Sequence, residues 1–257
     1  MKKIVAVIIA LMMFVSMTAF AAESDLDYVK QKGALIIGIT DFEPMDYQSE
    51  SGEWIGFDAD MAKAFAASLG VKAEFVVIDW DSKNLELDSK NIDCVWNGMT
   101  ITDGVKKAMA VSSPYCLNGQ VIVVKSEKAA EAISEEAVAG YSFAVEAGSA
   151  GEEVAKEKGW NIVSMQSQAD ALLEVASGMS DACVIDLLMA AAMVGEGTSY
   201  AGLAYTITLN EEEYGVGFRL ESDLPAALDA FFNSAYADGS MIACAEQYGV
   251  QASLIAR

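Results

Sequence analysis

The chain has 257 residues, with 38 acidic against 16 basic side chains and a formal net charge of −22 at pH 7. Such a charge repels nucleic acid and anionic lipid surfaces, so neither is an expected partner, whereas cationic and zwitterionic small molecules are not disfavoured. Histidine is absent, which excludes Ser-His-Asp and Cys-His catalytic machinery and histidine metal sites. We expect no metal site and no cofactor.

The N-terminus has the three parts of a secretory signal peptide. Lys2 and Lys3 form a basic segment, residues 4–17 are apolar, and Ala19–Ala21 is a small-x-small cleavage site. The apolar run is short for a membrane span. We therefore predict cleavage after Ala21 and export to the periplasm or the extracellular space. The alternative is an uncleaved N-terminal anchor. The remainder is long enough for one large or two modest domains.

Strands and helices alternate along the rest of the chain. The β-branched run at 34–39 (ALIIGI) predicts a buried strand, and 57–70 (FDADMAKAFAASLG) predicts an amphipathic helix that ends at Gly70. Residues 73–79 and 92–97 are predicted strands on either side of a short helix. This alternation indicates parallel α/β sheets.

The second half continues the alternation. Strands are predicted in QVIVVK, YSFAVE, NIVSM, ACVID and YGVGFR. Helices are predicted in EEVAKEKG, QADALLEVASG, LLMAAAMV and the long C-terminal run from Pro225 to Gly249. The Ala- and Glu-rich stretch 126–140 predicts a solvated surface helix.

Two helix–strand segments resemble each other. Residues 86–95 (ELDSKNIDCV) and 174–184 (EVASGMSDACV) each combine a helix end, a Ser-containing turn, an aspartate and a Cys-Val strand. The two strands end at Asn97 and Asp186. Because ligands of open α/β sheets bind beyond the carboxyl ends of strands, we expect both polar side chains at a binding crevice.

The four cysteines are far apart in sequence. Cys94 and Cys183 fall in apolar strands, where a buried free thiol is the simplest interpretation. A disulfide between Cys94 and Cys116 stays open as the alternative in an exported protein.

A series of short motifs follows in order along the chain: Gly33–Gly38, Pro44–Tyr47, Gly56–Ala62, Ile78–Asp81, Asn91–Asp93, Asn97–Thr102, Ser113–Tyr115, Gly148-Ser149, Asp181–Asp186 and Tyr214–Arg219. Their order and spacing resemble the extracellular solute-binding proteins of polar amino-acid ABC transporters. The resemblance covers essentially the whole chain after the leader.

The resemblance implies a two-lobed periplasmic-binding-protein fold of type II. Each lobe would be a mainly parallel sheet flanked by helices, and two crossover strands would join the lobes. The first lobe would comprise residues 22–118 and 212–257, and the second 119–211, so that 33–257 forms one solute-binding domain.

The implied function is the substrate-binding component of an ABC importer. Such a protein is a monomer that captures its solute by lobe closure, without catalysis, and delivers it to a permease in the membrane. The solute would be a small polar amino acid or an amino-acid-like molecule, zwitterionic or cationic.

The resemblance also implies ligand-binding residues. Phe42 and Trp80 match aromatics that sandwich the ligand side chain, and Asp186 matches the carboxylate that receives the α-ammonium group. A turn at the end of a strand would bind the ligand carboxylate through the backbone N–H and hydroxyl groups of Gly98, Thr100 and Thr102. A second turn would close on the ligand from the other lobe. These turns contain Asn97, Gly98, Thr100, Thr102, Gly148 and Ser149.

Two positions depart from the family pattern. Val105 stands where an arginine usually clamps the ligand carboxylate, and Ala150 stands where threonine is usual. Lys106 and Lys107 are rotated away from Val105 on the same helix and cannot replace the clamp. We therefore expect a ligand that either lacks a free α-carboxylate or binds it mainly through neutral donors and helix N-termini.

Several of these residues also have structural interpretations. Ser149 and Glu152 fit a Ser-x-x-Glu capping box, and Asp186 can cap the helix that follows it. The two aromatics can equally be core residues. Two further carboxylates are interpreted as complementing the dipole at a helix start: Asp58 and Asp60.

The alternative function is an enzyme on the same scaffold, of dehydratase or lytic type. The absence of histidine disfavours it, but Asp or Glu can act as acid and base. A bound small molecule that is returned unchanged would separate the two functions.

Overall fold

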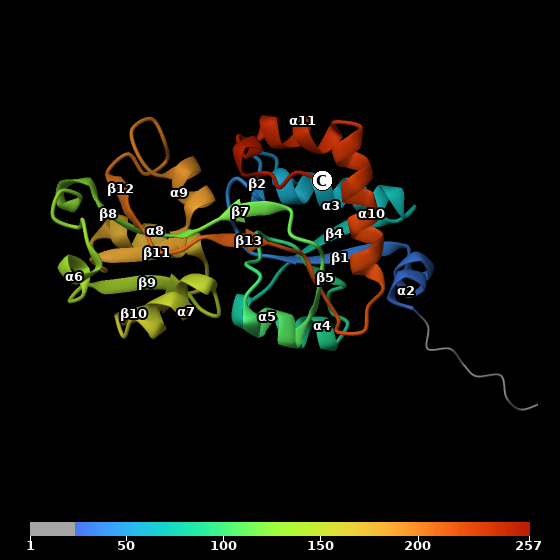
Figure 1. Ribbon diagram of the computed structural model, residues 1–257, viewed down its shortest axis with the longest axis horizontal. Coiled ribbons are helices and arrows are strands. Elements are labelled where there is room, and N and C mark those ends of the chain that lie inside the picture. Colours follow the sequence, from blue (N-terminus) through green and yellow to red (C-terminus); the bar gives the residue numbers. More distant parts are fainter. Residues whose placement is uncertain (1–23) are drawn as a thin grey trace, which may run out of the picture.

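The computed structural model describes residues 24–257, so the predicted leader at residues 1–21 and its cleavage site lie outside the described part of the chain. The described residues form two α/β lobes side by side, with two strands crossing between them (Figure 1). These crossover strands are β7 (Cys116–Asn118) and β13 (Glu212–Tyr214), which pair antiparallel. The predicted two-lobed fold is confirmed.

The first lobe is built on a five-stranded sheet of order β4-β1-β5-β14-β6. Its strands are β1 (Ala34–Ile39), β4 (Lys72–Val77), β5 (Cys94–Val95), β6 (Ala110–Val111) and β14 (Gly217–Phe218). Strand β1 has the predicted bounds, and five of its six residues are buried because it lies inside the sheet.

Helices flank this sheet, and a short hairpin of β2 (Tyr47–Gln48) and β3 (Trp54–Ile55) extends from it. The helices are α2 (Asp25–Lys32), α3 (Phe57–Ser68), α4 (Lys83–Asp88), α5 (Asp103–Ala108), α10 (Leu224–Ala237) and α11 (Ser240–Gln247), with 3-10 turns η1 (Trp80–Ser82) and η3 (Gln251–Ser253). The C-terminal run, predicted as one helix, is two. Gly239, with a φ of +83°, interrupts it.

The second lobe is built on a sheet of order β10-β9-β11-β8-β12. Its strands are β8 (Gln120–Lys125), β9 (Ser142–Glu146), β10 (Asn161–Met165), β11 (Ala182–Asp186) and β12 (Leu203–Thr208). Its helices are α6 (Glu135–Val138), α7 (Ala150–Glu157), α8 (Gln168–Ser177) and α9 (Leu187–Met193), with a 3-10 turn η2 (Ser126–Lys128).

The predicted surface helix at 126–140 is wrong. Only the short helices η2 and α6 form there, separated by turns and non-helical residues. Alanine and glutamate favour a helix locally, but this stretch has no regular apolar face to pack on the sheet.

The sheets are mixed rather than mainly parallel. In each sheet two strand pairs are parallel and two are antiparallel. The antiparallel pairs involve β14 in the first lobe and β8 in the second, which lie beside the crossovers and run against their neighbours. The two segments with similar sequences lead into β5 and β11, which hold the same place in the two strand orders.

All four cysteines are free thiols; Cys94, Cys116 and Cys183 are buried and Cys244 is half-buried. Cys94 and Cys183 are thus small apolar core residues, as interpreted, and Cys94 is not bonded to Cys116. No helix within residues 24–257 combines the length and apolarity that a membrane span requires.

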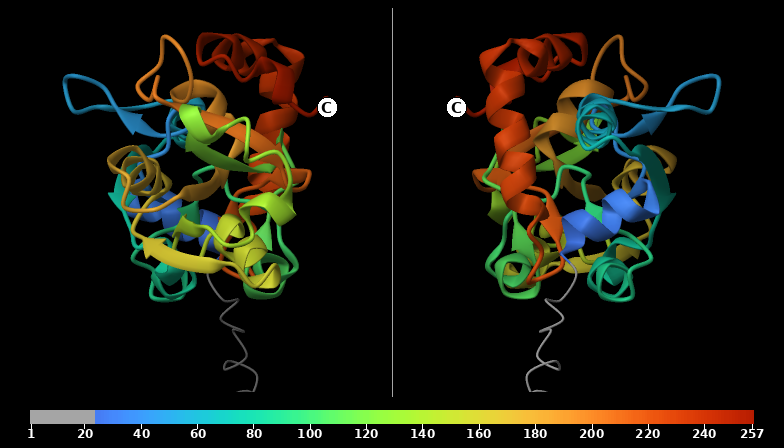
Figure 2. Two further views of the ribbon diagram at one scale, coloured as in Figure 1. Left: turned by 90° about the vertical axis from the view of Figure 1, so that its left-hand side faces the viewer. Right: turned by 90° about the vertical axis from the view of Figure 1, so that its right-hand side faces the viewer.

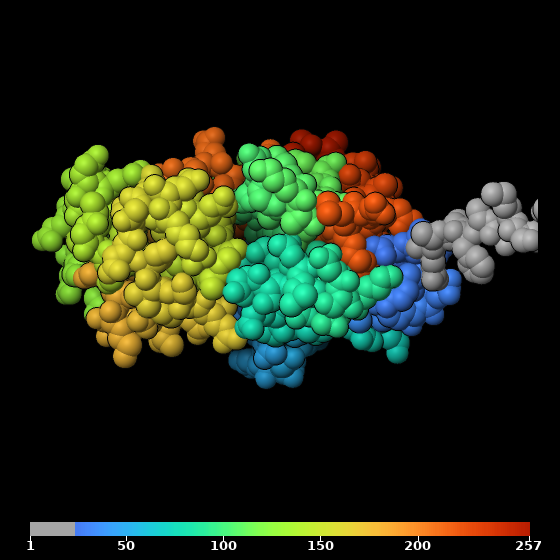
Figure 3. Space-filling view, turned by 90° about the horizontal axis from the view of Figure 1, so that it is seen from below, coloured from blue at the N-terminus to red at the C-terminus, as the bar shows by residue number. Residues whose placement is uncertain are grey.

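The lobes meet along a seam, which is visible from below as a contact between the segment near residue 80 and the segment near residue 150 (Figure 3). Lys83 Nζ donates to the Gly148 carbonyl at 2.9 Å, and Gln166 Nε2 donates to Asp79 Oδ1 at 2.8 Å across the seam. The end-on views show α10 and α11 along one flank of the first lobe (Figure 2). The structure is therefore that of closed lobes.

Candidate functional site

Two adjoining cavities lie between the lobes. The Asp186 cavity, of about 20 Å³, is lined by Phe42, Trp80, Asn97, Gly98, Thr100, Glu146, Ser149, Ala150, Gln168 and Asp186. The Lys83 cavity, of about 40 Å³, is lined by Trp80, Lys83, Met99, Thr100, Thr102, Val105, Gly148, Ser149, Ala150 and Glu153. The two cavities share a wall made of Trp80, Thr100, Ser149 and Ala150.

The structure brings together all nine residues that the sequence analysis assigns to ligand binding. Seven border the Asp186 cavity, whereas Thr102 and Gly148 border the Lys83 cavity. Their contact with a ligand stays a prediction. The walls also contain polar and charged residues that the sequence analysis did not name as site residues: Lys83, Glu146, Glu153 and Gln168.

Phe42 and Trp80 form apolar walls of the Asp186 cavity. Phe42 follows β1, and its ring meets Tyr214 edge-on with 6.4 Å between centroids. Trp80 begins η1, just after β4. The two side chains are 2% and 7% exposed, so both are also core residues. The two interpretations are compatible, because a packed ring that borders a cavity can still contact a ligand.

The turn after β5 uses its donors within the first lobe. The Asn97 amide hydrogen-bonds to Thr40 and to Asp46 Oδ2, the latter at 2.8 Å. Gly98 has a φ of +56°, and its N–H donates to the buried Asp58 carboxylate at 2.7 Å. This N–H, implied to bind a ligand carboxylate, is therefore engaged by Asp58.

The two threonines of this turn are also hydrogen-bonded. Thr100 Oγ1 donates to Glu212 Oε2 at 2.9 Å. Thr102 is the N-cap of α5, and its Oγ1 accepts the Val105 N–H at 3.2 Å. The Thr102 hydroxyl hydrogen stays available as a donor because capping uses only the oxygen.

The Gly148-Ser149 turn brings the second lobe against the first. Gly148 has a φ of +74°, and a Cβ on it would lie 2.6 Å from Asp81 Cα. Its N–H donates to Glu152 Oε2 at 2.9 Å. Ser149 is the N-cap of α7, and its Oγ accepts the Glu152 N–H at 3.1 Å. The predicted helix cap at Ser149 is confirmed, but Glu152 reaches back to the Gly148 N–H rather than to the Ser149 N–H that a complete capping box would use.

Asp186 lies at the end of β11 and is 4% exposed. It occupies the N-cap position of α9 but makes no capping bond with its side chain. Instead, its carboxylate accepts hydrogen bonds from the amides of Asn118, Gln120 and Gln168. Burial, and next the charge of Glu212, raise the pKa of Asp186 to about 7. The helix-cap interpretation of Asp186 is therefore wrong.

Glu146 is a second buried carboxylate in the same cavity, at the end of β9. It is 2% exposed, and its Oε1 has no hydrogen-bond partner within the described residues. Burial raises the pKa of Glu146 to about 8, and the charge of Asp186 adds to the rise. The strand-end rule that pointed to Asp186 also applies to β9, so the sequence did contain a signal for Glu146.

Gln168, the first residue of α8, ties these groups together. Its amide nitrogen donates to Asp186 Oδ2, and its carbonyl oxygen accepts the Asp186 N–H at 2.8 Å. The side chain is 7% exposed. Gln168 thereby fixes the direction of the Asp186 carboxylate.

Lys83, the first residue of α4, is 8% exposed in the wall of the other cavity. Its ammonium donates to the carbonyls of Trp80 at 3.0 Å and Gly148 at 2.9 Å, and lies 4.9 Å from the centre of the Trp80 ring. Burial lowers the pKa of Lys83 to about 8.

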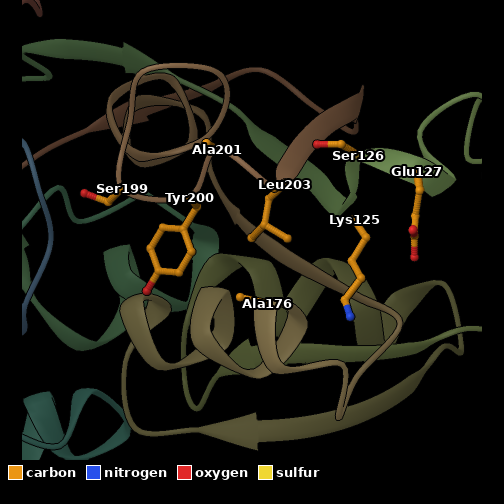
Figure 4. A pocket seen from close by; sticks show the side chains of 9 residues that line it. Lys125, Ser126, Glu127, Ala176, Ser199, Tyr200, Ala201 and Leu203 are labelled. Carbon is orange, nitrogen blue, oxygen red and sulfur yellow. The ribbon is translucent and has the colours of Figure 1, made fainter.

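A larger, open hollow of about 570 Å³ lies on the second lobe, between the ends of β8 and β12 (Figure 4). Its charged lining residues are Lys125, which is half-buried, and Glu127, which is exposed. None of the nine predicted site residues lines it. We therefore place the candidate site in the seam.

The seam cavities have opposite chemical character at their two ends. Buried carboxylates, Asp186 and Glu146, border one cavity, and a buried ammonium, Lys83, borders the other. A ring with a polarisable face, Trp80, borders both. This arrangement suits a small polar solute that carries a cationic group near the two carboxylates.

Comparisons with known proteins agree with this geometry. The family model described as bacterial extracellular solute-binding proteins, family 3, matches residues 35–251. The L-cystine-binding protein TcyJ of Escherichia coli is 28% identical over 93% of this chain and 91% of that protein. A solved structure of a mutant ArgBP from T. maritima superposes with a TM-score of 0.80 at 32% identity, covering 87% of this chain and 98% of that one.

A more limited match is to an enzyme. Cyclohexadienyl dehydratase of Pseudomonas aeruginosa is 31% identical over 50% of this chain and 48% of its own length. The family-model match, by contrast, extends over both lobes. The chain therefore belongs to the bacterial extracellular solute-binding proteins of family 3.

Proposed function

We propose that this protein is the substrate-binding component of an ABC importer. It captures a small polar amino acid or amino-acid-like solute, zwitterionic or cationic, between its lobes and delivers the solute to a permease. In this proposal the protein acts as a monomer, exported after cleavage following Ala21. Residues 22–118 and 212–257 form one lobe and 119–211 the other.

The observation that carries the proposal is the paired burial of Asp186 and Glu146 beside two aromatic walls. A buried carboxylate is costly unless it is neutral or paired with a cation. Glu146 Oε1 has no partner within the described residues, so a ligand ammonium or guanidinium can supply one. The Trp80 and Phe42 rings offer apolar contact to the rest of the solute.

The relatives support a solute of this class. TcyJ is described as an L-cystine-binding protein, and solved structures of ArgBP include an arginine-bound form. Both named ligands carry ammonium groups. The remaining predicted site residues, Asn97, Gly98, Thr100, Thr102, Gly148 and Ser149, then shape the cleft around the ligand.

A thermal-shift panel of amino acids, amines and related metabolites tests the proposal. A ligand at a hundred times its dissociation constant adds about 2.7 kcal/mol to the free energy of unfolding. We expect a rise in melting temperature with at least one cationic or zwitterionic compound and none with purely anionic ones. A rise with dicarboxylates alone would contradict the proposal.

Glu146 also keeps an enzyme as the second candidate. A carboxyl group with a pKa of about 8 is mostly protonated at pH 7 and can donate a proton to a leaving group. The partial match to a dehydratase points to the same class. Incubation of the protein with each compound that it binds, followed by mass spectrometry, separates the candidates. Recovery of the compound unchanged supports the binding protein, and loss of water from it supports the enzyme.

A further inference from the structure

Cations are scarce around the cleft. In the part of the chain that the structure describes, Lys83 is the one basic side chain among the residues that line the two cavities. The two arginines are engaged elsewhere. Arg219 pairs with Asp25 at 2.8 Å, and Arg257 donates to the Pro114 carbonyl at 3.0 Å. Neither is available to a ligand in the seam.

Lys83 has a donor to spare. An ammonium carries three N–H donors, and the Trp80 and Gly148 carbonyls account for two of them. The Trp80 carbonyl and ring hold the side chain from within its own lobe, and the Gly148 bond adds to them when the lobes close, so the ammonium is held in place in the closed site. A fixed and mostly dehydrated cation binds an anionic oxygen with little further loss of entropy.

The neutral donors near Lys83 are largely in use. The Gly98 N–H is bonded to Asp58, and the Gly148 N–H is bonded to Glu152. The Thr100 hydroxyl donates to Glu212. What remains in these two turns is the backbone N–H of Thr100 and of Ala150, which have no acceptor within the described residues, and the two capping hydroxyls of Thr102 and Ser149, which can each still donate one hydrogen.

The departures at Val105 and Ala150 fall on the same cavity as Lys83. Both side chains are small and apolar. The charged residues of that cavity wall are therefore Lys83, which is buried, and Glu153, which is exposed. The loss of an arginine and the presence of a buried lysine are thus found in one place.

We infer that the Lys83 ammonium binds a carboxylate of the ligand, in the role that the family resemblance gives to an arginine at position 105. The ligand then spans both cavities, with its carboxylate at Lys83 and its cationic group at Asp186 and Glu146. This inference rests on the proposed function and narrows the ligand class to zwitterions. It replaces the expectation, drawn from Val105 and Ala150, of a ligand that either lacks a free α-carboxylate or binds it mainly through neutral donors.

The pKa of Lys83 determines how this binding depends on pH. Burial lowers the pKa of Lys83 to about 8, against the opposing charges of Glu146, Asp81, Glu152 and Glu153. A ligand carboxylate favours the charged ammonium, so affinity for a carboxylate-bearing ligand falls as pH rises above about 8.

Matched ligand pairs test the inference. Isothermal titration calorimetry would compare arginine with agmatine, lysine with cadaverine and histidine with histamine, on the unmodified protein, Lys83→Met and Lys107→Met. Lys107 is exposed on α5 and provides the same change of charge away from both cavities. For a pair that binds, we expect Lys83→Met to weaken binding of the amino acid about tenfold more than binding of the amine. Lys107→Met should weaken binding of neither compound.

Closure and carboxylate binding are separable in this design. Loss of the Lys83 bond to Gly148 weakens binding of the amino acid and of the amine equally. Only the difference between the two losses of affinity therefore measures the contact between Lys83 and the ligand carboxylate. Equal weakening, or no weakening, overturns the inference and leaves the proposed function standing. If no member of any pair binds the unmodified protein, the proposed ligand class fails and the inference fails with it.

Discussion

At the scale of single residues, the seam is defined by buried groups that would ordinarily be charged. Asp186 and Glu146 are 4% and 2% exposed, and burial raises the pKa values of both carboxyl groups to about 7 and about 8. Such groups are stable while they are protonated or paired. A cationic ligand supplies the pairing, which gives these two residues a shared role in recognition.

Asp186→Asn removes one of the two charges without changing the size of the side chain. We expect it to weaken a cationic ligand by about 1.5–3 kcal/mol, because a charge-assisted hydrogen bond becomes a neutral one. Calorimetric titration measures the change. Asp88→Asn, on the exposed end of α4, is the control and should leave affinity unchanged. If Asp186→Asn binds as well as the unmodified protein, Asp186 serves only the hydrogen bonds to its three amide partners.

Ligand binding should also release protons. Because the pKa of Glu146 is raised to about 8, its carboxyl is mostly protonated at pH 7, and a ligand cation favours the ionised form. Affinity should therefore rise as pH increases from about 6 to about 8. Titration in phosphate and in Tris, which differ in heat of ionisation, counts the protons released.

Glu146→Gln removes one of the carboxyl groups that would release a proton when the ligand binds. We expect fewer protons released by this variant than by the unmodified protein, and no change for Glu157→Gln on the exposed face of α7. A binding heat that is the same in both buffers for the unmodified protein would show that neither carboxyl group changes its proton on binding.

At the scale of elements, the turn before α7 decides how closely the lobes approach. Gly148 meets Asp81 backbone to backbone, and its carbonyl accepts the Lys83 bond. Further across the seam, the amides of Asn118 and Gln120, at the crossover, contact both Asp186 and Glu212. The site is thus connected to the segments about which the lobes would move.

Gly148→Ala separates closure from folding. An added Cβ would lie 2.6 Å from Asp81 Cα in the closed structure, so the variant should lower ligand affinity by about tenfold or more. Gly159→Ala is the matched control, since its φ of +69° is similar and nothing lies within 4 Å of the added Cβ. Both variants should lose about 1–2 kcal/mol of stability from the left-handed backbone. Equal affinities for the two variants would mean that the lobes do not close at Gly148.

The sequence predicted most elements, and its errors have local causes. Strand β1 was predictable because it is a bounded apolar run rich in isoleucine, and the start of α7 because Ser149 is a strong helix cap. The break at Gly239 was missed because apolar periodicity continues across it. The direction of β14 and β8 depends on the crossovers, which no local pattern records.

The candidate site was predictable where a strand end or a family motif marks it. Asp186 and Trp80 belong to this group. Lys83 was missed because its burial results from contact with Gly148, 65 positions away in the chain. Gln168 was missed for the same reason, since its partner Asp186 lies on another element.

At the scale of the whole molecule, buried carboxyl groups connect stability to pH. Asp46 and Asp58, beside the first-lobe turn, are fully buried like the two site carboxylates, and burial raises the pKa of Asp58 to about 7 and that of Asp46 well above its usual range. The folded state therefore holds protons that the unfolded state has lost between about pH 4 and pH 8. The stability from these groups is full below pH 4 and is lost as pH rises through their folded pKa values.

The free protein should consequently be less stable at pH 8 than at pH 5.5. Each such carboxyl group lowers the free energy of unfolding by up to about 1.4 kcal/mol per pH unit in this range. Denaturant titrations at the two pH values measure the difference, and 0.5 M salt controls for repulsion within a chain of net charge −22. Asp58→Asn should reduce the slope. Equal stability at the two pH values would show that these carboxyl groups ionise as freely when folded as when unfolded.

We expect the closed seam to hold one small zwitterion, with its cationic group at Asp186 and Glu146 and its carboxylate at Lys83. Mass spectrometry of the molecule released by denaturing freshly purified protein tests this most directly. We expect a single small compound that carries both an ammonium or guanidinium group and a carboxylate. It should be released at about one per chain from the unmodified protein and in reduced amount from Asp186→Asn. Release of an anionic or uncharged compound, equally from both proteins, would contradict this expectation.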